Sequence, residues 1–381
     1  MKIEIRKAGF VNKGAELMLR AIQQEVRGKY RTVDFVMEPR NRMATYLKRA
    51  EAGLYQKLKT GGRRRALTNF AVRYSPQWRK EYGIVLDREI DAVLDAAGFA
   101  YGDQFGAGRT VELAKFSRRC RKLGTRLILL PQAFGPFSSP EIRKAMEEVI
   151  GNADFIFARE KVSYEHLCGI SGERENIRRA PDFTNLVIGS PPENFPFREG
   201  ICFIPNNKMI EKSESDVAER YISFLSDCVR YVKKLGEESF ILVHEGRNDQ
   251  IIAEKVSESA GGVPVLMEED PLRVKGIIGQ CKAVVSSRFH GIVSAFSQGI
   301  PALATGWSHK YWLLFEDYGF PEGLIDMRES GDQWKSRMNQ IIDDGFNKSL
   351  RGKLAEKAVV FKKQSAEMWG EVFTLLDEAE K

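Results

Sequence analysis

The sequence lacks the features that would place it in a membrane or among disulfide-rich secreted proteins. No run of apolar residues approaches the roughly 18 that are needed to span a bilayer. The opening residues, Met1-Lys-Ile-Glu-Ile, follow a strand pattern without the apolar segment of a signal peptide. The 5 cysteines are scattered and form no CxxC pair, which argues against a disulfide framework. We therefore expect a cytoplasmic protein with reduced thiols.

Several common signatures of cofactor sites and active sites are also missing. There is no GxGxxG or P-loop pattern for a dinucleotide or nucleotide phosphate. No HExxH motif or cluster of Cys and His suggests a metal site. The GxSxG elbow of many hydrolases is absent as well. We expect neither a bound metal nor a resident cofactor.

The length and the pattern of the chain predict two α/β domains. A chain of 381 residues is too long for one ordinary domain, and strand-like and helix-like segments alternate along it, as in parallel sheets. Residues 189–196 hold three prolines and a glycine and form the best linker. We expect two Rossmann-like domains, at 1–190 and 198–345, that face each other across a cleft. A helical tail at 346–381 is expected to cross back to the first domain.

Positive charge is concentrated in one segment of the predicted first domain. The chain carries a formal charge of +7, whereas residues 40–80 contain 12 Lys or Arg and only one acid, Glu51. Apolar residues at helical spacing predict a basic helical insertion there. It is either a solvated basic face or a surface that meets anionic lipid or a phosphorylated acceptor. Nucleic acid is not expected, because no nucleic-acid-binding pattern accompanies the charge.

The most informative segment is 284–304, which reads as a buried strand, a polar turn, a helix and a second buried strand. The turn places Arg288 and His290 at the carboxyl end of the first strand, where open α/β sheets bind ligands. An arginine and a histidine beside a helix N-terminus suit a phosphate or a carboxylate. Other candidate residues at predicted strand ends are Asn12, Gly14, Glu16, Asp103, Arg159, Asp182, Asn206, His244, Glu245 and Lys310.

The order of several motifs resembles the polysaccharide pyruvyl transferases. The matching segments are Asn12-Lys-Gly-Ala-Glu16, Ala96-Ala-Gly-Phe-Ala-Tyr-Gly-Asp103, Pro131-Gln-Ala-Phe-Gly-Pro136, Ala158-Arg-Glu-Lys-Val-Ser163, Pro181-Asp182, Ser286-Ser-Arg-Phe-His290 and Gly299-Ile-Pro301. Ala15 stands where the family has an aspartate, and Phe289 replaces its usual leucine. The resemblance implies a GT-B-like, two-domain enzyme that moves pyruvate from phosphoenolpyruvate to sugar hydroxyls of a cell-surface polysaccharide or its precursor.

The resemblance also implies roles for individual residues. Arg159, Arg288 and His290 would contact phosphoenolpyruvate with the backbone near Phe289, and Lys310 would add positive charge. His290 could donate a proton, and a carboxylate from Glu16, Asp103 or Glu245 would serve as base. The residues expected on the acceptor side are Asn12, Gly14, Glu16, His244 and Glu245. Structural alternatives stay open: an ion pair of Arg159 with Asp182 or Glu160, a surface position for Arg288, and a helix-capping role for His290.

Two other functions remain compatible with the sequence. A GT-B glycosyltransferase would have the same two domains, and an arginine and a histidine could bind the diphosphate of a nucleotide sugar. A non-catalytic protein that binds an anionic surface would account for the charge of residues 40–80. Binding of a nucleotide sugar rather than phosphoenolpyruvate would favour the glycosyltransferase. Salt-sensitive binding to vesicles, without turnover of any donor, would favour the non-catalytic protein.

Overall fold

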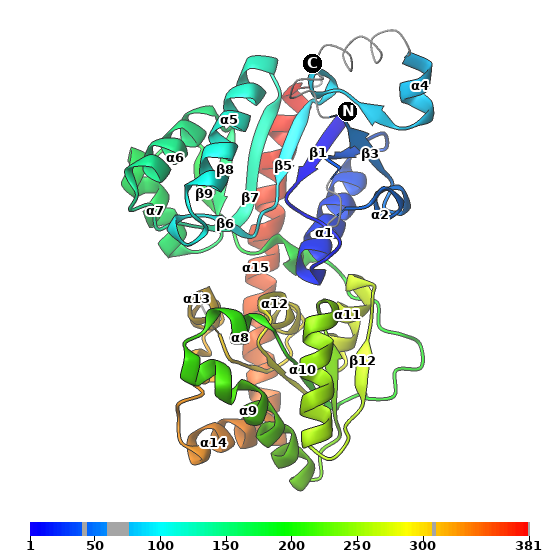
Figure 1. Ribbon diagram of the computed structural model, residues 1–381, viewed down its shortest axis with the longest axis vertical. Helices are drawn as coiled ribbons and strands as arrows, with labels where there is room; N and C mark the ends of the chain where they lie inside the picture. The colour runs from blue at the N-terminus through cyan, green and yellow to red at the C-terminus, as the bar shows by residue number, and fades with distance from the viewer. Residues whose placement is uncertain (40–43, 59–75, 307–309, 380–381) are drawn as a thin grey trace. The chain divides into compact units, whose positions relative to one another are not determined.

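The computed structural model describes residues 1–39, 44–58, 76–306 and 310–379 (Figure 1). Its contacts group the chain into two compact units. The first holds Met1–Val11, Met18–Phe183 and Gln364–Lys381, and the second holds Asn12–Leu17 and Thr184–Lys363. Each unit is built on one parallel sheet, so the predicted fold class is confirmed. The units change between residues 183 and 184, a few residues before the proline-rich stretch.

The first unit contains a parallel sheet with the order β4-β3-β2-β1-β5-β7-β8-β9, and β6 pairs with β7. The strands are β1 (Lys2–Arg6), β2 (Asp34–Met37), β3 (Leu54–Lys57), β4 (Ile84–Val85), β5 (Ala92–Asp95), β6 (Phe99–Tyr101), β7 (Arg126–Phe134), β8 (Phe155–Ala158) and β9 (Ile177–Arg179). The strand order reverses between β1 and β5, which lie side by side. Open α/β sheets commonly bind ligands at the carboxyl ends of the strands beside such a reversal.

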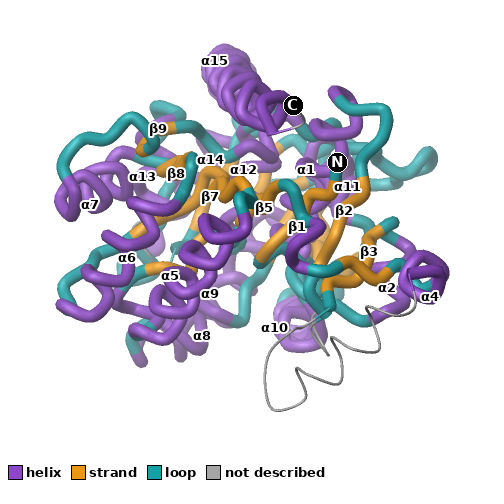
Figure 2. Tube along the Cα trace, turned by 90° about the horizontal axis from the view of Figure 1, so that it is seen from above, coloured by secondary structure: helices purple, strands orange, loops and turns teal. Residues whose placement is uncertain are grey.

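Helices cover both faces of the first sheet (Figure 2). They are α1 (Lys13–Lys29), α2 (Tyr46–Glu51), α4 (Pro76–Glu81), α5 (Ala107–Leu123), α6 (Pro140–Asn152) and α7 (Lys161–Ser171), with the 3-10 helices η1 (Asp87–Glu89), η2 (Asp103–Phe105) and η3 (Phe183–Leu186). On one face, Leu113, Met146 and Leu167 of α5, α6 and α7 join the core. On the other face lie α1 and the end of α15 (Asp344–Ala379), where the Tyr30 hydroxyl donates to the Phe373 carbonyl at 3.3 Å.

The predicted basic helical insertion is only partly helical. Residues 54–57, which fit a helical spacing in the sequence, form β3 and pair with β2, so the helical prediction is wrong there. Leu54 fills a buried position beside Phe35, and this sheet packing outweighs a weak helical pattern. Residues 40–43 and 59–75 of the insertion lie outside the described part of the chain.

The second unit has the sheet order β12-β11-β10-β13-β14, with every pair parallel. Its strands are β10 (Ile201–Ile204), β11 (Ser239–Val243), β12 (Val265–Met267), β13 (Ala283–Ser286) and β14 (Ala302–Ala304). The chain moves outward from β10 to β12 and then returns to β13 on the other side of β10. This doubly wound order places its reversal between β10 and β13.

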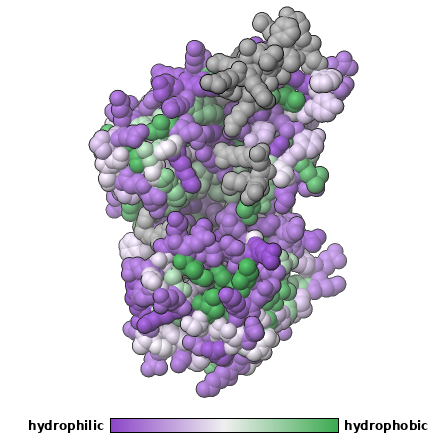
Figure 3. Space-filling model, in the orientation of Figure 1, coloured by the Kyte–Doolittle hydropathy of each residue, from purple (hydrophilic) through white to green (hydrophobic). Residues whose placement is uncertain are grey.

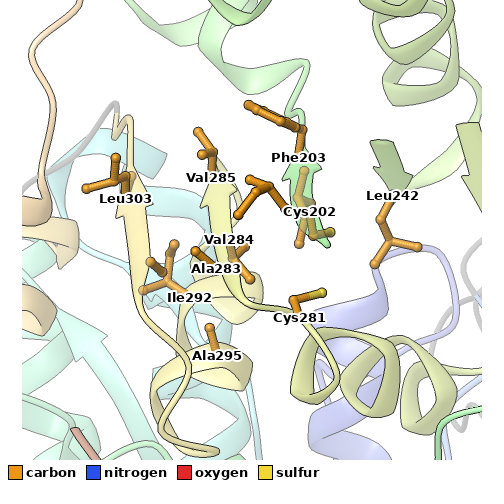
Figure 4. Packing of buried hydrophobic residues seen from close by; sticks show 14 of the residues in the cluster. Cys202, Phe203, Leu242, Cys281, Ala283, Val284, Val285, Ile292, Ala295 and Leu303 are labelled. Carbon is orange, nitrogen blue, oxygen red and sulfur yellow. The ribbon is translucent and has the colours of Figure 1, made fainter. Parts of the chain in front are cut away.

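Buried strands and helices make a continuous core in the second unit. The helices are α8 (Lys208–Lys212), α9 (Ser215–Lys234), α10 (Gly246–Ser259), α11 (Pro271–Gly279), α12 (Phe289–Phe296), α13 (Lys310–Asp317) and α14 (Gly331–Ile342), with the 3-10 helix η4 (Pro321–Gly323). Figure 4 shows Phe203 of β10, Val285 of β13 and Leu303 of β14 with Ile292 of α12 in this core. Because β13 and α12 are almost wholly buried, the turn that joins them is fixed at both ends.

The C-terminal helix α15 contributes to both units. Its residues up to Lys363 group with the second unit, and those from Gln364 onward group with the first. In the first unit, Trp369 is 1% exposed and packs edge-on against Phe183 at a ring distance of 6.1 Å. The tail that was expected to return to the first domain therefore does so as one helix. Outside the cores, hydrophilic residues cover most of the face shown in Figure 3.

Candidate functional site

The turn after β13 lies at the point where the strand order of the second sheet reverses. Strand β10, which lies beside β13 in the sheet, ends at Ile204, and Asn206 follows two residues later. The Asn206 side chain donates to the Ser287 carbonyl at 2.8 Å, so the ends of β10 and β13 are tied together. Open α/β sheets bind ligands at such a reversal. The sequence placed Arg288 and His290 at a strand end, and the structure has them there.

A buried hydrogen-bond network holds the turn in place. The Ser287 hydroxyl accepts from the Tyr221 hydroxyl at 2.7 Å and lies 2.6 Å from the Thr305 hydroxyl. The Tyr311 hydroxyl donates to the Ser287 carbonyl at 2.8 Å. Burial raises the pKa of Tyr221 far above its usual range, so its hydroxyl stays neutral. Side chains from α9, from the residue that follows β14 and from α13 thus fix one serine, which in turn fixes the backbone that carries Arg288.

Arg288 is a buried arginine with two acidic partners. Its side chain is 8% exposed, and Nε donates to Asp249 Oδ2 at 2.9 Å. One terminal nitrogen also contacts Asp249, and the other contacts Glu245. Asp249 is 1% exposed; burial raises its pKa, although Arg288 and a hydrogen bond from the Asn207 amide oppose the shift. Arg288 is therefore not a surface arginine, and its guanidinium plane is fixed.

The start of α1 packs against the same turn. Asn12 caps α1, because its Oδ1 accepts from the Gly14 amide at 2.8 Å, and its Nδ2 donates to Glu245 Oε2 at 3.0 Å. A Cβ atom on Gly14 would lie only 2.2 Å from His290 Nδ1. The imidazole of His290, which is half-buried in the first turn of α12, therefore lies against bare backbone. This contact gives a physical reason for glycine in the Asn-x-Gly motif.

His244 and Glu16 lie in this part of the second unit. Burial lowers the pKa of His244 well below its usual value, and the nearby charges of Arg288, His290 and Lys13 lower it further. Its imidazole is therefore neutral at physiological pH, and among the described residues its buried Nδ1 has no hydrogen-bond partner. Glu16 is mostly buried, and its carboxylate lies 3.3 Å from Lys13 Nζ. A neutral His244 can hydrogen-bond a polar ligand but cannot attract an anion by charge.

Lys310 lies at the other side of the turn. Its Nζ is 5.0 Å from the centre of the Phe289 ring, and Phe289 packs edge-on against Tyr311 at 5.8 Å. A lysine over an aromatic face is held by a cation–π interaction, which limits where its charge can lie. Phe289, which replaces the leucine that is usual in the family, thus holds the ammonium group of Lys310 through this cation–π interaction.

The second unit brings together most of the residues predicted for the site: Asn12, Gly14, Glu16, His244, Glu245, Arg288, Phe289, His290 and Lys310. The sequence analysis did not select Asp249, the main partner of Arg288. Asp249 sits within the first turn of α10, where an acid is an ordinary helix feature. Its only unusual property is burial, which shows in the structure and left no mark in the sequence pattern.

Arg159 and Asp103 belong to the first unit. Arg159 follows β8 and pairs with Asp182 at 3.2 Å, and both side chains are buried. The ion pair with Asp182 that was left open as a structural role for Arg159 is therefore present. A role of Arg159 in donor binding stays a prediction. Asp103 accepts from the Ser138 amide at 2.8 Å and the Ser139 amide at 3.4 Å. Burial alone would raise its pKa, but these hydrogen bonds outweigh it and lower the pKa.

The strand reversal of the first sheet is occupied by another ion pair that the sequence analysis missed. Arg6 ends β1 and Asp95 ends β5; these aligned residues lie 3.2 Å apart. The Tyr101 hydroxyl donates to Asp95 at 2.9 Å, and burial raises the pKa of Tyr101 well above its usual value. All three are almost fully buried. The only signal in the sequence was the alternation of charged and apolar residues in β1, and this pattern is the same as that of a strand with one exposed face.

The described part of the chain shows neither a metal centre nor a membrane-spanning helix. In residues 1–39, 44–58, 76–306 and 310–379, no group of three or more His, Cys, Asp or Glu is arranged to hold a metal ion. None of the helices described in these ranges is both long enough and apolar enough to span a membrane.

Solved structures with a similar fold include a galactosyltransferase, a UDP-GlcNAc 2-epimerase and two proteins in complex with UDP. The S. aureus MnaA–UDP structure has a TM-score of 0.61 at 13% identity and covers 99% of this chain and 97% of its own. HepE from Anabaena, in complex with UDP and glucose, has a TM-score of 0.56 at 13% identity, covering 99% and 100%. The lipopolysaccharide outer core galactosyltransferase WaaB has a TM-score of 0.51 at 15% identity, covering 98% and 99%. At these identities the likeness shows a shared GT-B fold.

The sequence supplies the assignment that the fold leaves open. A family model described as polysaccharide pyruvyl transferase matches residues 12–309. The match includes Asn12 and Gly14 at one end and the Arg288 turn near the other, which the structure joins in one cluster. The chain therefore belongs to the polysaccharide pyruvyl transferase family and is a transferase.

Proposed function

We propose that the protein transfers pyruvate from phosphoenolpyruvate to hydroxyls of a cell-surface polysaccharide or its precursor and forms a ketal. The observation that supports this most strongly is the Arg288 turn at the strand reversal of the second sheet. There a fixed guanidinium, the first turn of α12 and His290 lie next to one another. Helix N-termini and arginines favour phosphate and carboxylate groups, and phosphoenolpyruvate carries one of each.

The donor contacts that we propose come from four residues of the second unit. Arg288 presents its remaining N–H groups to one anionic group, and the backbone at Phe289 presents the helix N-terminus. His290 hydrogen-bonds the phosphate, and Lys310 adds a positive charge held over the Phe289 ring. Arg159 keeps its predicted role because of the family resemblance alone, and its neighbour in the first unit is Asp182.

The reaction that we propose breaks one bond to phosphate and forms two bonds to the sugar. A proton adds to the methylene carbon of the donor while a sugar hydroxyl oxygen attacks the central carbon. The carbon–oxygen bond to phosphate then breaks, and a second hydroxyl attacks the same carbon. The two hydroxyl protons balance the proton on the new methyl group and the proton taken by phosphate. The intermediate cation resembles an oxocarbenium ion, which a nearby carboxylate stabilises.

Acid–base roles follow from the positions of the titratable groups. We propose His290 as the proton donor to the departing phosphate. Glu245 contacts Arg288, and Glu16 lies on the helix turn that packs against His290; both remain candidates for the base. Asp103 is also a candidate, although its lowered pKa makes it a weaker base. On the acceptor side we propose Asn12, Gly14, Glu16, His244 and Glu245.

We propose a reaction without a metal or a resident cofactor, in the cytoplasm, where phosphoenolpyruvate is made. The supporting observation is the absence of metal and dinucleotide signatures from the sequence. Activity should survive dialysis against a chelator. Loss of activity that a divalent metal restores would overturn this part of the proposal.

The direct test is to incubate the protein with phosphoenolpyruvate and a panel of surface glycans or lipid-linked precursors. We expect phosphate release that depends on an acceptor, and a pyruvyl ketal on the glycan by mass spectrometry. His290→Ala is the matched negative control, with its unfolding transition checked. Absence of phosphate release together with absence of donor binding by calorimetry would refute the proposal.

The alternative reaction uses a nucleotide sugar, and the UDP complexes of two structural neighbours favour keeping it in the test. A thermal-shift comparison of phosphoenolpyruvate with a set of UDP-sugars separates the two donors. Stabilisation by phosphoenolpyruvate alone supports pyruvyl transfer. Stabilisation by a UDP-sugar alone, with sugar transfer, would assign the chain a glycosyltransferase reaction.

We also infer that residues 40–80 contact an anionic membrane surface. Beyond the charge excess, Trp78 and Tyr82 are 67% and 55% exposed, and their rings pack edge-on 5.9 Å apart. Lys80 of α4 is exposed as well. Exposed aromatic and basic side chains together suit a lipid interface. Vesicles with phosphatidylglycerol should sediment the protein, and Trp78→Ala with Lys80→Glu should release it; equal sedimentation with neutral vesicles would contradict the inference.

A further inference from the structure

A second groove lies in the second unit on α9 and α14. Its volume is about 580 Å³, and its aromatic floor consists of Tyr231, which is half-buried, and of Phe224 and Trp334, which are 7% and 8% exposed. Trp334 packs edge-on against Phe224 at 5.8 Å and against Tyr231 at 5.6 Å. The Tyr231 hydroxyl donates to Asn339 Oδ1 at 2.9 Å, which fixes its ring. The groove shares no residue with the Arg288 turn.

The rim of this groove is strongly basic. It carries Arg220, Arg230, Lys234 and Lys335, against the single acid Asp227. Asp227 is already paired with Arg230. Lys335 Nζ lies 5.6 Å from the Trp334 ring centre, so its charge is held at the edge of the aromatic floor. No ion pair joins Arg220 or Lys234 to any carboxylate among the described residues. The lining therefore has an excess of three positive charges.

We propose that the groove binds a carboxylate-bearing segment of the glycan that the enzyme modifies. The apolar faces of sugar rings pack on aromatic side chains, and arginine and lysine bind carboxylates. This identification of the occupant rests on the proposed function, because pyruvyl transfer leaves a carboxylate on each modified unit. A chain that has been modified once becomes complementary to the groove. Binding there retains the polymer near the enzyme between successive transfers.

The test uses a short oligogalacturonate as the probe, with its methyl ester as the neutral match. The wild-type protein should bind the acid form, more weakly at higher salt, and should not bind the ester. Arg220→Glu with Lys335→Glu should weaken binding about tenfold, because two exposed contacts each become repulsive. Lys255→Glu with Lys357→Glu is the matched control: both lysines are exposed in the second unit, outside the groove, and the charge change is identical.

A second measurement keeps the groove separate from the catalytic site. With phosphoenolpyruvate and a short neutral acceptor, the groove variant should release phosphate at the wild-type rate. With a long acceptor it should give products with fewer ketals per chain. Absence of binding to the acid probe, or equal binding by the groove and control variants, would overturn the groove proposal. Groove-dependent probe binding without any pyruvyl transfer would instead refute the proposed function and leave an anionic-saccharide groove.

Discussion

Replacement of Gly14 by alanine tests whether the position of His290 matters for catalysis. The new Cβ would lie 2.2 Å from His290 Nδ1 and 2.7 Å from its Cγ, so the imidazole has to turn away. That displacement costs roughly 0.5–1.5 kcal/mol if the side chain leaves its preferred rotamer. Alanine in place of glycine in α1 returns up to about 1 kcal/mol of helix propensity. We therefore expect the free energy of unfolding to change by no more than about 1.5 kcal/mol.

The effect on turnover should be far larger than the effect on stability. A shift of about 1 Å in a catalytic group costs on the order of 10²-fold in rate, so Gly14→Ala should lower kcat about 100-fold. Acceptor-dependent phosphate release and denaturant unfolding measure the two quantities. Gly28→Ala is the matched control, because Gly28 lies in the same helix and its new Cβ would meet nothing within 4 Å. If Gly14→Ala turns over like Gly28→Ala, the placement of His290 against α1 has no role in catalysis.

Four further predictions follow from the site and its surroundings. Arg288→Ala should weaken phosphoenolpyruvate binding by about 1.5–3 kcal/mol by calorimetry, whereas Arg288→Lys should keep more stability but still lose affinity; unchanged affinity would remove this arginine from the site. Glu245→Gln should tighten donor binding and lower kcat, because it removes a negative charge near the anion; weaker binding would contradict this. The pKa of Asp103 is lowered in the folded protein, so the ionised carboxylate stabilises the fold fully above about pH 4, and this contribution is lost as the pH falls through the pKa of the folded state. Asp103→Asn should therefore make the free energy of unfolding less dependent on pH in the acid range, whereas an unchanged acid dependence would mean that other carboxyls cause it. A thiol reagent should label Cys168 before the other cysteines, because Cys168 is half-buried, whereas Cys120, for example, is buried and has its pKa raised by burial to about 12. Cys168→Ser should abolish the fast phase of thiol labelling.

The local pattern of the sequence was sufficient to place Arg288 and His290 at the end of a strand. A buried strand followed by a polar turn and an apolar helix fixes Arg288 and His290 at a strand end whatever the rest of the chain does. The alternation of strand-like and helix-like segments along the chain was likewise sufficient to predict two parallel sheets. Both inferences depend on neighbours in sequence, where periodicity and turn chemistry act directly.

The partners of the site could not be predicted in the same way. Asp249 lies 39 residues before Arg288, and Tyr221 lies 66 residues before Ser287. One sequence contains many acids and tyrosines at comparable positions, and nothing local marks the ones that become buried together. The contact of Gly14 with His290 spans an even longer separation. The family resemblance singled out Gly14, but the geometric reason for a glycine required the structure.

The charges around Arg288 limit how the site can hold an anion. In this part of the second unit, Lys13, Arg288 and Lys310 face three carboxylates, those of Glu16, Glu245 and Asp249, while His244 is neutral.

We therefore expect an anion to be attracted mainly by directed groups, namely the N-terminus of α12 and the hydrogen bonds of Arg288 and His290, and less by net charge. The two carboxylates on Arg288 are not equivalent. Asp249 is nearly inaccessible and also binds the Asn207 amide, so it holds the arginine in place. Glu245 is more exposed and is shared with Asn12, so we expect an incoming donor to meet this carboxylate rather than Asp249. This difference is why we expect Glu245 to weaken donor binding and to serve the acceptor, whereas Asp249 serves only the position of Arg288.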